Sequence, residues 1–513
     1  MVAVVLCLVQ THSALFPWGD HAIVEGETMR AWAGEQLLGT YSRYGWNHPG
    51  PALFYWMAPW HSLFGRSPAA LNASVAFLNA LSLAAIVAVV GRRAGRTAAF
   101  GAAAVMSLYV AQQGPELMRD FWIPHAVVLP FATLIVVTAA AAAGSLWLVP
   151  LVALVASYLA ETDLSVAPAS LAVLVAGAAF FVAARGWRGL RRDRRLLAMV
   201  AVTVLVCAVV WYPPLYEQLR SGPGNAKAVM NFFLHPDLAK DPDLGKSLGQ
   251  GISAVANAGS VLVAGKRDAV DTAHASAWKE LFLLVTLAAL AAGTVVAWQR
   301  NRRFASALCL CALTALVGEI YAVTHIRGEL YTYLVDWSGA AAAVGWIGVL
   351  CAFTPERLLD PGVAGAGRAA VTAGAALAAA VIVWNVVAQV RTADLASHDP
   401  AYSWRPQKAI DLAVRRWAAT SGKQRPTIYI PQNDAWSAAA GVYIDRLRHG
   451  QAVTIDPGWL GVFGTKFAPG SSADSALVFT LSAQPQPTLL RGAYKLVEAG
   501  GVIVNASPPP PVK

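Results

Sequence analysis

The sequence predicts a mainly α-helical, polytopic membrane protein with a small α/β domain at its C-terminal end. Of the 513 residues, 57% are hydrophobic and only 13% are charged, too few charges to cover the surface of a water-soluble protein of this length. The apolar residues recur in blocks of roughly 17 to 24, the length that crosses a hydrocarbon core of about 30 Å. After residue 390 the composition becomes mixed, which predicts the soluble domain.

The apolar blocks predict about 11 membrane helices within a transmembrane domain at residues 1–390. If the N-terminus is cytoplasmic, residues 17–68, the long loop 213–277 and the tail from residue 391 lie on the outer side. The predicted spans are near residues 1–16, 69–91, 97–113, 124–143, 146–159, 166–184, 196–212, 278–298, 304–324, 331–352 and 369–390.

The basic residues are placed as topological signals. A net charge of +10 could suggest a nucleic-acid partner, but the arginines gather in short connections between apolar blocks. In the predicted topology all these connections are cytoplasmic, which is the positive-inside bias. We therefore expect a multi-pass protein of the cell membrane with an extracytoplasmic C-terminal domain and no nucleic-acid partner. The groups are Arg92, Arg93 and Arg96; Arg185 to Arg195; Arg300, Arg302 and Arg303; and Arg357 and Arg368.

Three N-terminal segments have a character of their own. Residues 1–16 are apolar but short and lack basic residues. We interpret them as a first membrane helix, which a late start codon could have shortened, and not as a cleaved signal peptide. Residues 26–38 mix polar and apolar residues at helical spacing and predict a helix along the membrane surface. Residues 51–64 are rich in aromatics, as at a lipid–water boundary, and either continue into the second span or lie flat before it.

The tail predicts a small α/β domain at residues 391–505, followed by a disordered Pro-rich stub at 506–513. An amphipathic helix is expected near 402–420. Asn433 or Asp434 then caps a second helix that runs to about Arg448. The strand-like runs are Thr427 to Ile430, Ala452 to Ile455, Ala476 to Thr480 and Val502 to Asn505.

Charged side chains gather at the outer ends of the predicted helices. Ionisable groups at membrane depth are costly and tend to line cavities, so their convergence on one face predicts a pocket that opens outward. The residues concerned are Asp20 and Glu25 after the first span, Arg119 and Asp120 after the third, Glu161 and Asp163 after the fifth, and Arg327 after the ninth, with Glu319 inside the bilayer.

The block from Asp20 to Pro59 carries a family resemblance. It reads D-H-A-I-V-E and then Y-S-R-Y-G-W-N-H-P-G-P-A-L-F-Y-W-M-A-P. This is similar to the first outer loop of the C-type (GT-C) glycosyltransferase superfamily, which includes protein O-mannosyltransferases and lipid A aminoarabinose transferases. The longer string resembles membrane proteins of high-GC bacteria. Asp20 matches the acid that follows the first helix in that superfamily, and His48-Pro49-Gly50-Pro51 matches its His/Lys-Pro-Pro-Leu motif.

Two departures from the family pattern concern the acids and the proline motif. The usual Asp-Glu pair is Asp20-His21 here, so the second acid is absent or moved to Glu25. The proline motif has glycine at its third place. The nature of the donor and any requirement for a divalent metal are left open.

The resemblance implies transfer of a sugar, with inversion, from a polyprenyl-phosphate donor to a glycan, lipid or protein acceptor at the outer face of the membrane. Asp20 is then the general base, by match to the family. By charge and position, further residues are candidates for other roles. They are Glu25 and Asp120 as second carboxylate; Arg43, His48, Arg119 and Arg327 for the donor phosphate; and Tyr44, Trp46, Glu161 and Asp163 as contacts to acceptor or sugar.

Structural roles are the alternative for several of these residues. Asp20 could end a helix at the interface, and His48 could belong to a turn. Glu161 and Asp163 could cap the next helix, and Asp120 could form an ion pair with Arg119.

Two other functions remain open from the sequence. A lipid or glycan transporter or flippase would be expected to show paired repeats and polar groups at the bilayer midplane. A non-catalytic scaffold for envelope assembly would use the outer domain alone.

Overall fold

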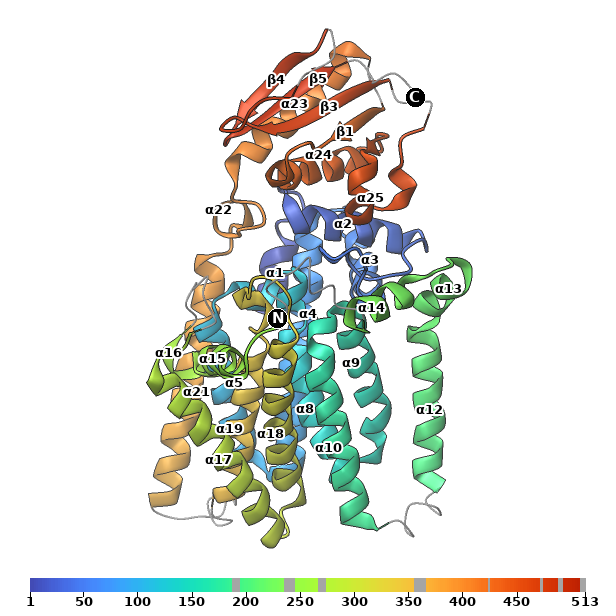
Figure 1. Cartoon of the computed structure of the whole chain (residues 1–513). Coiled ribbons are helices and arrows are strands. Elements are labelled where there is room, and N and C mark those ends of the chain that lie inside the picture. Colours follow the sequence, from blue (N-terminus) through green and yellow to red (C-terminus); the bar gives the residue numbers. More distant parts are fainter. Residues whose placement is uncertain are drawn as a thin grey trace. The chain divides into compact units, whose positions relative to one another are not determined.

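The computed structural model describes residues 1–186, 194–234, 245–265, 274–354, 366–422, 425–470, 474–487 and 492–507. The chain divides into two compact units (Figure 1). The first consists of Met1–Ala3, His48–Leu53 and Val75–Val390, and the second of Val4–Asn47, Phe54–Ser74 and Arg391–Lys513. The predicted stub lies outside the described residues from residue 508 on, as does Arg357.

Within the described residues, six helices are long and apolar enough to cross a membrane, or seven if one bent pair forms a single span. The bent pair is α12 (Arg194–Val210) and α13 (Tyr212–Arg220), which meet at 51°. The six are α4 (Pro68–Ala94), α7 with α8 (Ile123–Ala142), the 3-10 turn η2 with α10 (Leu164–Arg185), α17 (Ala277–Gln299), α18 (Arg303–Thr324) and residues Thr372–Arg391 of α21 (Ala366–Arg391).

The multi-pass helical fold is confirmed, but the predicted number of about 11 spans is not. Several apolar blocks form helices that are too short to cross the hydrocarbon core, because a helix rises only about 1.5 Å per residue. The predicted span 1–16 contains α1, which has only seven residues. The short helices are α1 (Val2–Leu8), α9 (Val149–Thr162) and α19 (Ser338–Phe353), whereas α5 (Arg96–Gln113) has 18 residues but is not apolar enough to count as a span.

The core of the first unit is built around α8 (Val128–Ala142), every residue of which is buried. Helix α18 packs against α8, α10, α17 and α19. Small residues allow this close approach: a Cβ added at Gly318 of α18 would lie 3.0 Å from the backbone of Ala169. The remaining elements of this unit are α6 (Glu116–Arg119), α14 (Asn225–Leu234), α15 (Leu248–Gly259), α16 (Val261–Ala264), η1 (Leu146–Leu148) and η3 (Thr332–Leu334).

The second unit contains the predicted α/β domain, with a five-stranded sheet in the order β2-β1-β3-β5-β4. Strand β1 runs parallel to β2 and β3, while β5 is antiparallel to β3 and β4. The four predicted strands and both predicted helices are present, and β4 is additional, but the second helix begins at Trp436 after a 3-10 turn, so neither Asn433 nor Asp434 is its N-cap. The bounds are α22 (Leu395–His398), α23 (Arg405–Ser421), β1 (Pro426–Tyr429), η4 (Asn433–Ala435), α24 (Trp436–Arg448), β2 (Thr454–Ile455), η5 (Pro457–Trp459), α25 (Leu460–Phe463), η6 (Thr465–Phe467), β3 (Ser475–Leu481), β4 (Tyr494–Ala499) and β5 (Val502–Ser507).

Two helices from the N-terminal loop also belong to the second unit. Helix α2 (Gly19–Trp32) packs against α24 (Figure 1), and its Ala22 and Ile23 lie in the hydrophobic core of the sheet domain. The surface helix predicted at 26–38 is therefore wrong in its bounds, because apolar residues from Ala22 on bury this segment against protein. Helix α3 (Ala52–Leu63) is separate from α4 and does not continue into it.

Candidate functional site

The predicted site residues are divided between the two units. Those of the second unit lie on α2 and on the loop that follows it, and those of the first unit lie at helix ends. The second unit holds Asp20, Glu25, Arg43, Tyr44 and Trp46; the first holds His48, Arg119, Asp120, Glu161, Asp163 and Arg327.

Asp20 is the second residue of α2, where the partial positive charge of a helix N-terminus stabilises a carboxylate. Its Oδ1 accepts a hydrogen bond of 2.7 Å from the Tyr41 hydroxyl. The Tyr41 ring in turn meets the Trp436 ring edge-on, with centroids 6.1 Å apart. Because Trp436 begins α24, the C-terminal domain supports the tyrosine that orients Asp20.

Residues 41–47 form a tight hairpin. The amide of Ser42 donates to the carbonyl of Trp46 at 2.7 Å, and Gly45 takes the left-handed conformation that the turn requires, with φ of 80°. Arg43 and Tyr44 lie exposed at the tip, with the guanidinium carbon 5.3 Å from the ring centroid, whereas Trp46 is buried. The string Tyr-Ser-Arg-Tyr-Gly-Trp-Asn therefore presents one cation and one aromatic ring outward.

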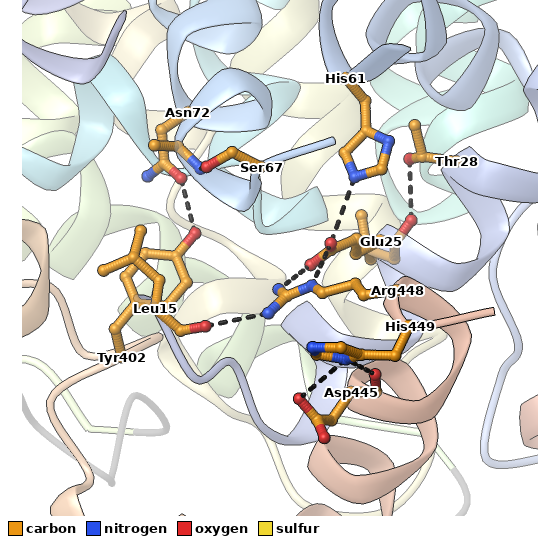
Figure 2. A network of polar contacts seen from close by, with 12 residues as sticks. Leu15, Glu25, Thr28, His61, Ser67, Asn72, Tyr402, Asp445, Arg448 and His449 are labelled. Atoms are coloured by element: carbon orange, nitrogen blue, oxygen red, sulfur yellow. Dashed lines mark hydrogen bonds and ion pairs between the residues drawn. The ribbon is translucent and has the colours of Figure 1, made fainter. Parts of the chain in front are cut away.

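Glu25, predicted as a second carboxylate, is held in an ion pair. The Nε of Arg448 donates to its Oε1 at 2.6 Å and Nη2 donates to its Oε2, while Nε2 of His61 lies 3.2 Å from Oε1 (Figure 2). Burial acts to raise the pKa of Glu25, but Arg448 and His61 outweigh it and hold that pKa below its ordinary value. Glu25 is thus an ionised carboxylate with two basic partners.

Glu27 is the acid on α2 that interacts electrostatically with Asp20. It is buried, and its Oε2 accepts no hydrogen bond from the described residues. Burial raises the pKa of Glu27 to about 7, and the charge of Asp20 adds to this, while Arg30 and the Thr40 hydroxyl act in the opposite direction. The guanidinium of Arg30 lies 3.7 Å away. Glu27 therefore changes its charge near neutral pH.

The motif His48-Pro49-Gly50-Pro51 docks on the end of α9 in the first unit. The Nδ1 of His48 accepts a hydrogen bond of 2.9 Å from the amide of Leu164. Burial lowers the pKa of His48, although Asp163 opposes this. The imidazole is therefore neutral at pH 7, with its proton on Nε2. Asp163 accepts from the amide of Ser165 at 2.9 Å and so caps the following 3-10 turn, as the structural alternative predicts.

Glu161 explains the glycine in this motif. A Cβ built on Gly50 would lie 2.4 Å from the Glu161 carboxyl carbon and Oε2, and the Gly50 amide donates to the Glu161 carbonyl at 3.2 Å. Any side chain at position 50 would require the Glu161 carboxyl group to move. The structure thus brings His48, Glu161 and Asp163 together, and the glycine at position 50 leaves room for the Glu161 carboxyl group.

Gly50→Ala is expected to destabilise the protein by about 1 kcal/mol, because the buried Glu161 carboxyl group must turn away from the new methyl group. Thermal unfolding in detergent measures the effect. The double variant Gly50→Ala/Glu161→Ala lacks the Glu161 carboxyl group and should recover part of the lost stability. Gly101→Ala is the matched control, because its Cβ would enter open space on a helix. If Gly50→Ala unfolds at the same temperature as Gly101→Ala, the Glu161 carboxyl group does not restrict position 50.

Arg119 is the last residue of α6, and Asp120 follows it before α7 (Ile123–Ala126). Arg119 is buried. Asp120 accepts from the Trp122 amide at 2.9 Å and lies 2.7 Å from Nδ1 of His125. Trp122 packs edge-on against both His125 and Tyr333. A buried arginine thus directly precedes a carboxylate–histidine pair in the sequence.

Arg327 contacts α14 from the loop after α18. Its guanidinium carbon lies 3.8 Å from the centroid of the Phe232 ring, and Nη2 donates to the Phe232 carbonyl. Since a cation over an aromatic face is attracted by the ring quadrupole, this contact holds α14 and the arginine together.

No group of three or more histidine, cysteine or acidic side chains within the described part of the chain is arranged to hold a metal ion. Four residues that matter here were not assigned from the sequence: Tyr41, Glu27, His61 and Arg448. A signal for Glu27 was present, because residues seven apart on a helix lie on one face while residues five apart lie about 140° apart. Glu27 therefore shares a face with Asp20, and Glu25 does not.

Two crystal structures share the fold of this chain. They are of ArnT from Cupriavidus metallidurans, one bound to undecaprenyl phosphate and one in the apo state. Each matches with a TM-score of 0.58 at 14% sequence identity, over 98% of this chain and 96% of ArnT. No protein-family model matches the sequence, and no curated protein does. The likeness confirms the fold expected from the resemblance to lipid A aminoarabinose transferases.

Proposed function

We propose that this protein is a membrane-embedded glycosyltransferase that transfers a sugar from a polyprenyl-phosphate donor. The observation that carries the proposal is the fold, which agrees with that of ArnT over nearly the whole of both chains. One ArnT structure contains undecaprenyl phosphate, the carrier that such a donor would release. The match of Asp20 and of His48 to Pro51 with the loop motif of the superfamily supports the same conclusion.

Asp20 is the general base of the proposed reaction. The acceptor hydroxyl oxygen attacks the anomeric carbon from the face opposite the phosphate, and its proton passes to the Asp20 carboxylate. The bond between the anomeric carbon and the phosphate oxygen breaks, and its electron pair leaves with the phosphate. The configuration is inverted. The hydrogen bond from Tyr41 supports this role, because it fixes the direction of one carboxylate oxygen.

The leaving phosphate needs positive charge and hydrogen-bond donors. We assign these to Arg43, Arg119 and Arg327, whose planar guanidinium groups match phosphate oxygens. His48 contributes a neutral N–H donor from Nε2 rather than a cation, since its Nδ1 accepts from Leu164. Asp120 acts here through His125, whose imidazole it holds in place.

Contacts to the sugar or acceptor are assigned to Tyr44, Trp46, Glu161 and Asp163. Tyr44 is exposed at the tip of the hairpin, where its ring can stack on a sugar face. In this proposal the protein is a multi-pass component of the cell membrane, and the second unit lies at the extracytoplasmic face, where the lipid-linked donor presents its sugar.

The test uses the full chain in lipid nanodiscs with undecaprenyl-phosphate-linked pentoses and hexoses and an envelope glycan and lipid fraction as acceptor. The expected result is release of undecaprenyl phosphate together with a glycosylated product of inverted configuration. Accumulation of the donor inside proteoliposomes without any glycosylated product would overturn the proposal in favour of a transporter. If the donor stays intact and is neither transferred nor transported, the non-catalytic scaffold for envelope assembly is the function that remains.

Tyr41→Phe is expected to lower kcat about tenfold, because Asp20 loses a hydrogen bond to a charged group, worth about 1.5 kcal/mol. The same assay of undecaprenyl phosphate release measures this change. Tyr494→Phe, on the exposed β4, is the control and should keep wild-type turnover. Unchanged kcat in Tyr41→Phe would show that the tyrosine does not orient the base.

A further inference from the structure

Arg448 is bound through all three of its guanidinium nitrogens. Nε and Nη2 donate to the two carboxylate oxygens of Glu25 in a bidentate pair, and Nη1 donates to the carbonyl of Leu15 at 2.9 Å (Figure 2). A bidentate guanidinium–carboxylate pair fixes both distance and orientation. The last residue of α24 thus holds both α2 and the segment that leads into it.

His61 of α3 completes the junction from another part of the chain. Its Nε2 lies 3.2 Å from Oε1 of Glu25. The side chains of Glu25, His61 and Arg448 are 0%, 3% and 14% exposed, so water does not compete for these contacts. Three stretches that are remote in sequence therefore meet at the Glu25 carboxylate: α2 with the segment before it, α3 and α24.

Close packing beside the ion pair limits the movement of α2. A Cβ added to Gly26, the residue after Glu25, would lie 2.8 Å from the hydroxyl and ring of Tyr443. Because Glu25 and Asp20 belong to the same helix, fixing the Glu25 side chain and the Gly26 backbone sets the rotation of α2 about its axis. That rotation sets the direction in which Asp20 points.

A buried ion pair is a poor device for stability alone, since well-packed apolar residues of similar volume often stabilise as much or more. The advantage of a bidentate ion pair is that it forms in only one relative orientation of its two side chains. We propose that Arg448 is a positioning residue: through Glu25 it fixes α2, and with it Asp20, in the orientation needed for proton abstraction. This inference rests on the proposed function.

The test replaces the pair by apolar residues in Glu25→Met/Arg448→Met and measures the full-length protein in nanodiscs. We expect the unfolding temperature to stay close to that of the wild type, because no carboxylate or guanidinium is left buried alone, although the Leu15 carbonyl and His61 each lose a partner. We expect kcat for release of undecaprenyl phosphate to fall about 10- to 100-fold with KM for the donor unchanged, as for a misplaced catalytic group. Hydrogen exchange of peptides covering Gly19–Trp32 should increase.

The matched control removes a second arginine–carboxylate pair of the same domain, in Arg415→Met/Asp445→Asn. Arg415 of α23 pairs with Asp445 of α24, so this pair joins α23 to α24 rather than α24 to α2. This control should keep wild-type kcat. Arg448→Lys retains one ionic contact and should recover part of the turnover lost in the apolar pair, which a purely structural role would not predict.

Two negative outcomes are distinguishable. Asp20-dependent turnover in the wild type combined with full turnover in the apolar pair would overturn the positioning role and leave the proposed function standing. Absence of Asp20-dependent turnover in the wild type would overturn the proposed function, and this inference with it.

Discussion

Asp20→Asn is expected to lower sugar transfer by at least about 100-fold while the unfolding temperature stays close to that of the wild type. General-base catalysis typically contributes 10²- to 10⁴-fold, and an amide cannot accept the proton of the acceptor hydroxyl. The shape is preserved, and the Tyr41 hydroxyl can still donate to the amide oxygen. Release of undecaprenyl phosphate from the lipid-linked donor, measured at saturating donor, reports the loss in kcat.

Asp434→Asn is the matched control for this substitution. It makes the same chemical change at an exposed aspartate of the same domain, in η4, and should leave turnover unchanged. Donor binding gives a second check, because a base that acts only in the transition state contributes little to KM. Wild-type kcat in Asp20→Asn would show that Asp20 takes no part in the reaction.

Local sequence patterns were sufficient for most of the secondary structure. The predicted spans 278–298 and 304–324 lie within two residues of α17 and α18, because long apolar blocks bounded by arginines have few other solutions. The predicted strands of the soluble domain agree with the observed β1, β2, β3 and β5. Strand β4 was missed because it is a half-exposed edge strand, Y-K-L-V-E-A, without an apolar run.

Such patterns could not predict that α2 belongs to the second unit. Its partner Arg448 follows Glu25 by 423 residues, and periodicity within a window reports which face is apolar but not what covers it. For a related reason, the membrane helix predicted at residues 1–16 was too long. Leu15 lies in this range, yet its carbonyl accepts from Arg448 in the second unit.

The candidate site was predictable where a motif names the residue and unpredictable where packing decides. Asp20 and the residues from His48 to Pro51 came from the loop motif, but the glycine at position 50 is explained only by the buried carboxyl group of Glu161. The choice between Glu25 and Glu27 depended on the start of α2, which the sequence placed too late. With the helix beginning at Gly19, helical geometry alone places Glu27 on the face of Asp20.

Glu27 makes the stability of the protein depend on pH. Its pKa is raised from 4.5 to about 7 in the folded state, first by burial and further by Asp20. The folded protein therefore holds this proton over a range in which the unfolded chain has lost it. The contribution of Glu27 to stability is greatest below pH 4.5, falls as the pH rises through about 7, and is constant above that. The full difference corresponds to about 3 kcal/mol.

Glu27→Gln is expected to remove this dependence. Glutamine resembles the protonated acid, so the variant and the wild type should have similar stability near pH 4.5, and the variant should be more stable by up to about 3 kcal/mol near pH 8. Chemical denaturation in detergent at several pH values between these limits measures the difference. In an Asp20→Asn background the gain should be smaller, because one cause of the raised pKa is absent.

Glu498→Gln, on the half-exposed β4, is the matched control for the removal of a carboxylate. A difference between Glu27→Gln and wild type that stays constant from pH 4.5 to pH 8 would mean that Glu27 does not titrate in this range. A difference that shrinks as the pH rises would mean that the folded state favours the carboxylate. Arg30 would then outweigh burial, and Glu27 would be the negative partner of Arg30 in a simple ion pair near Asp20.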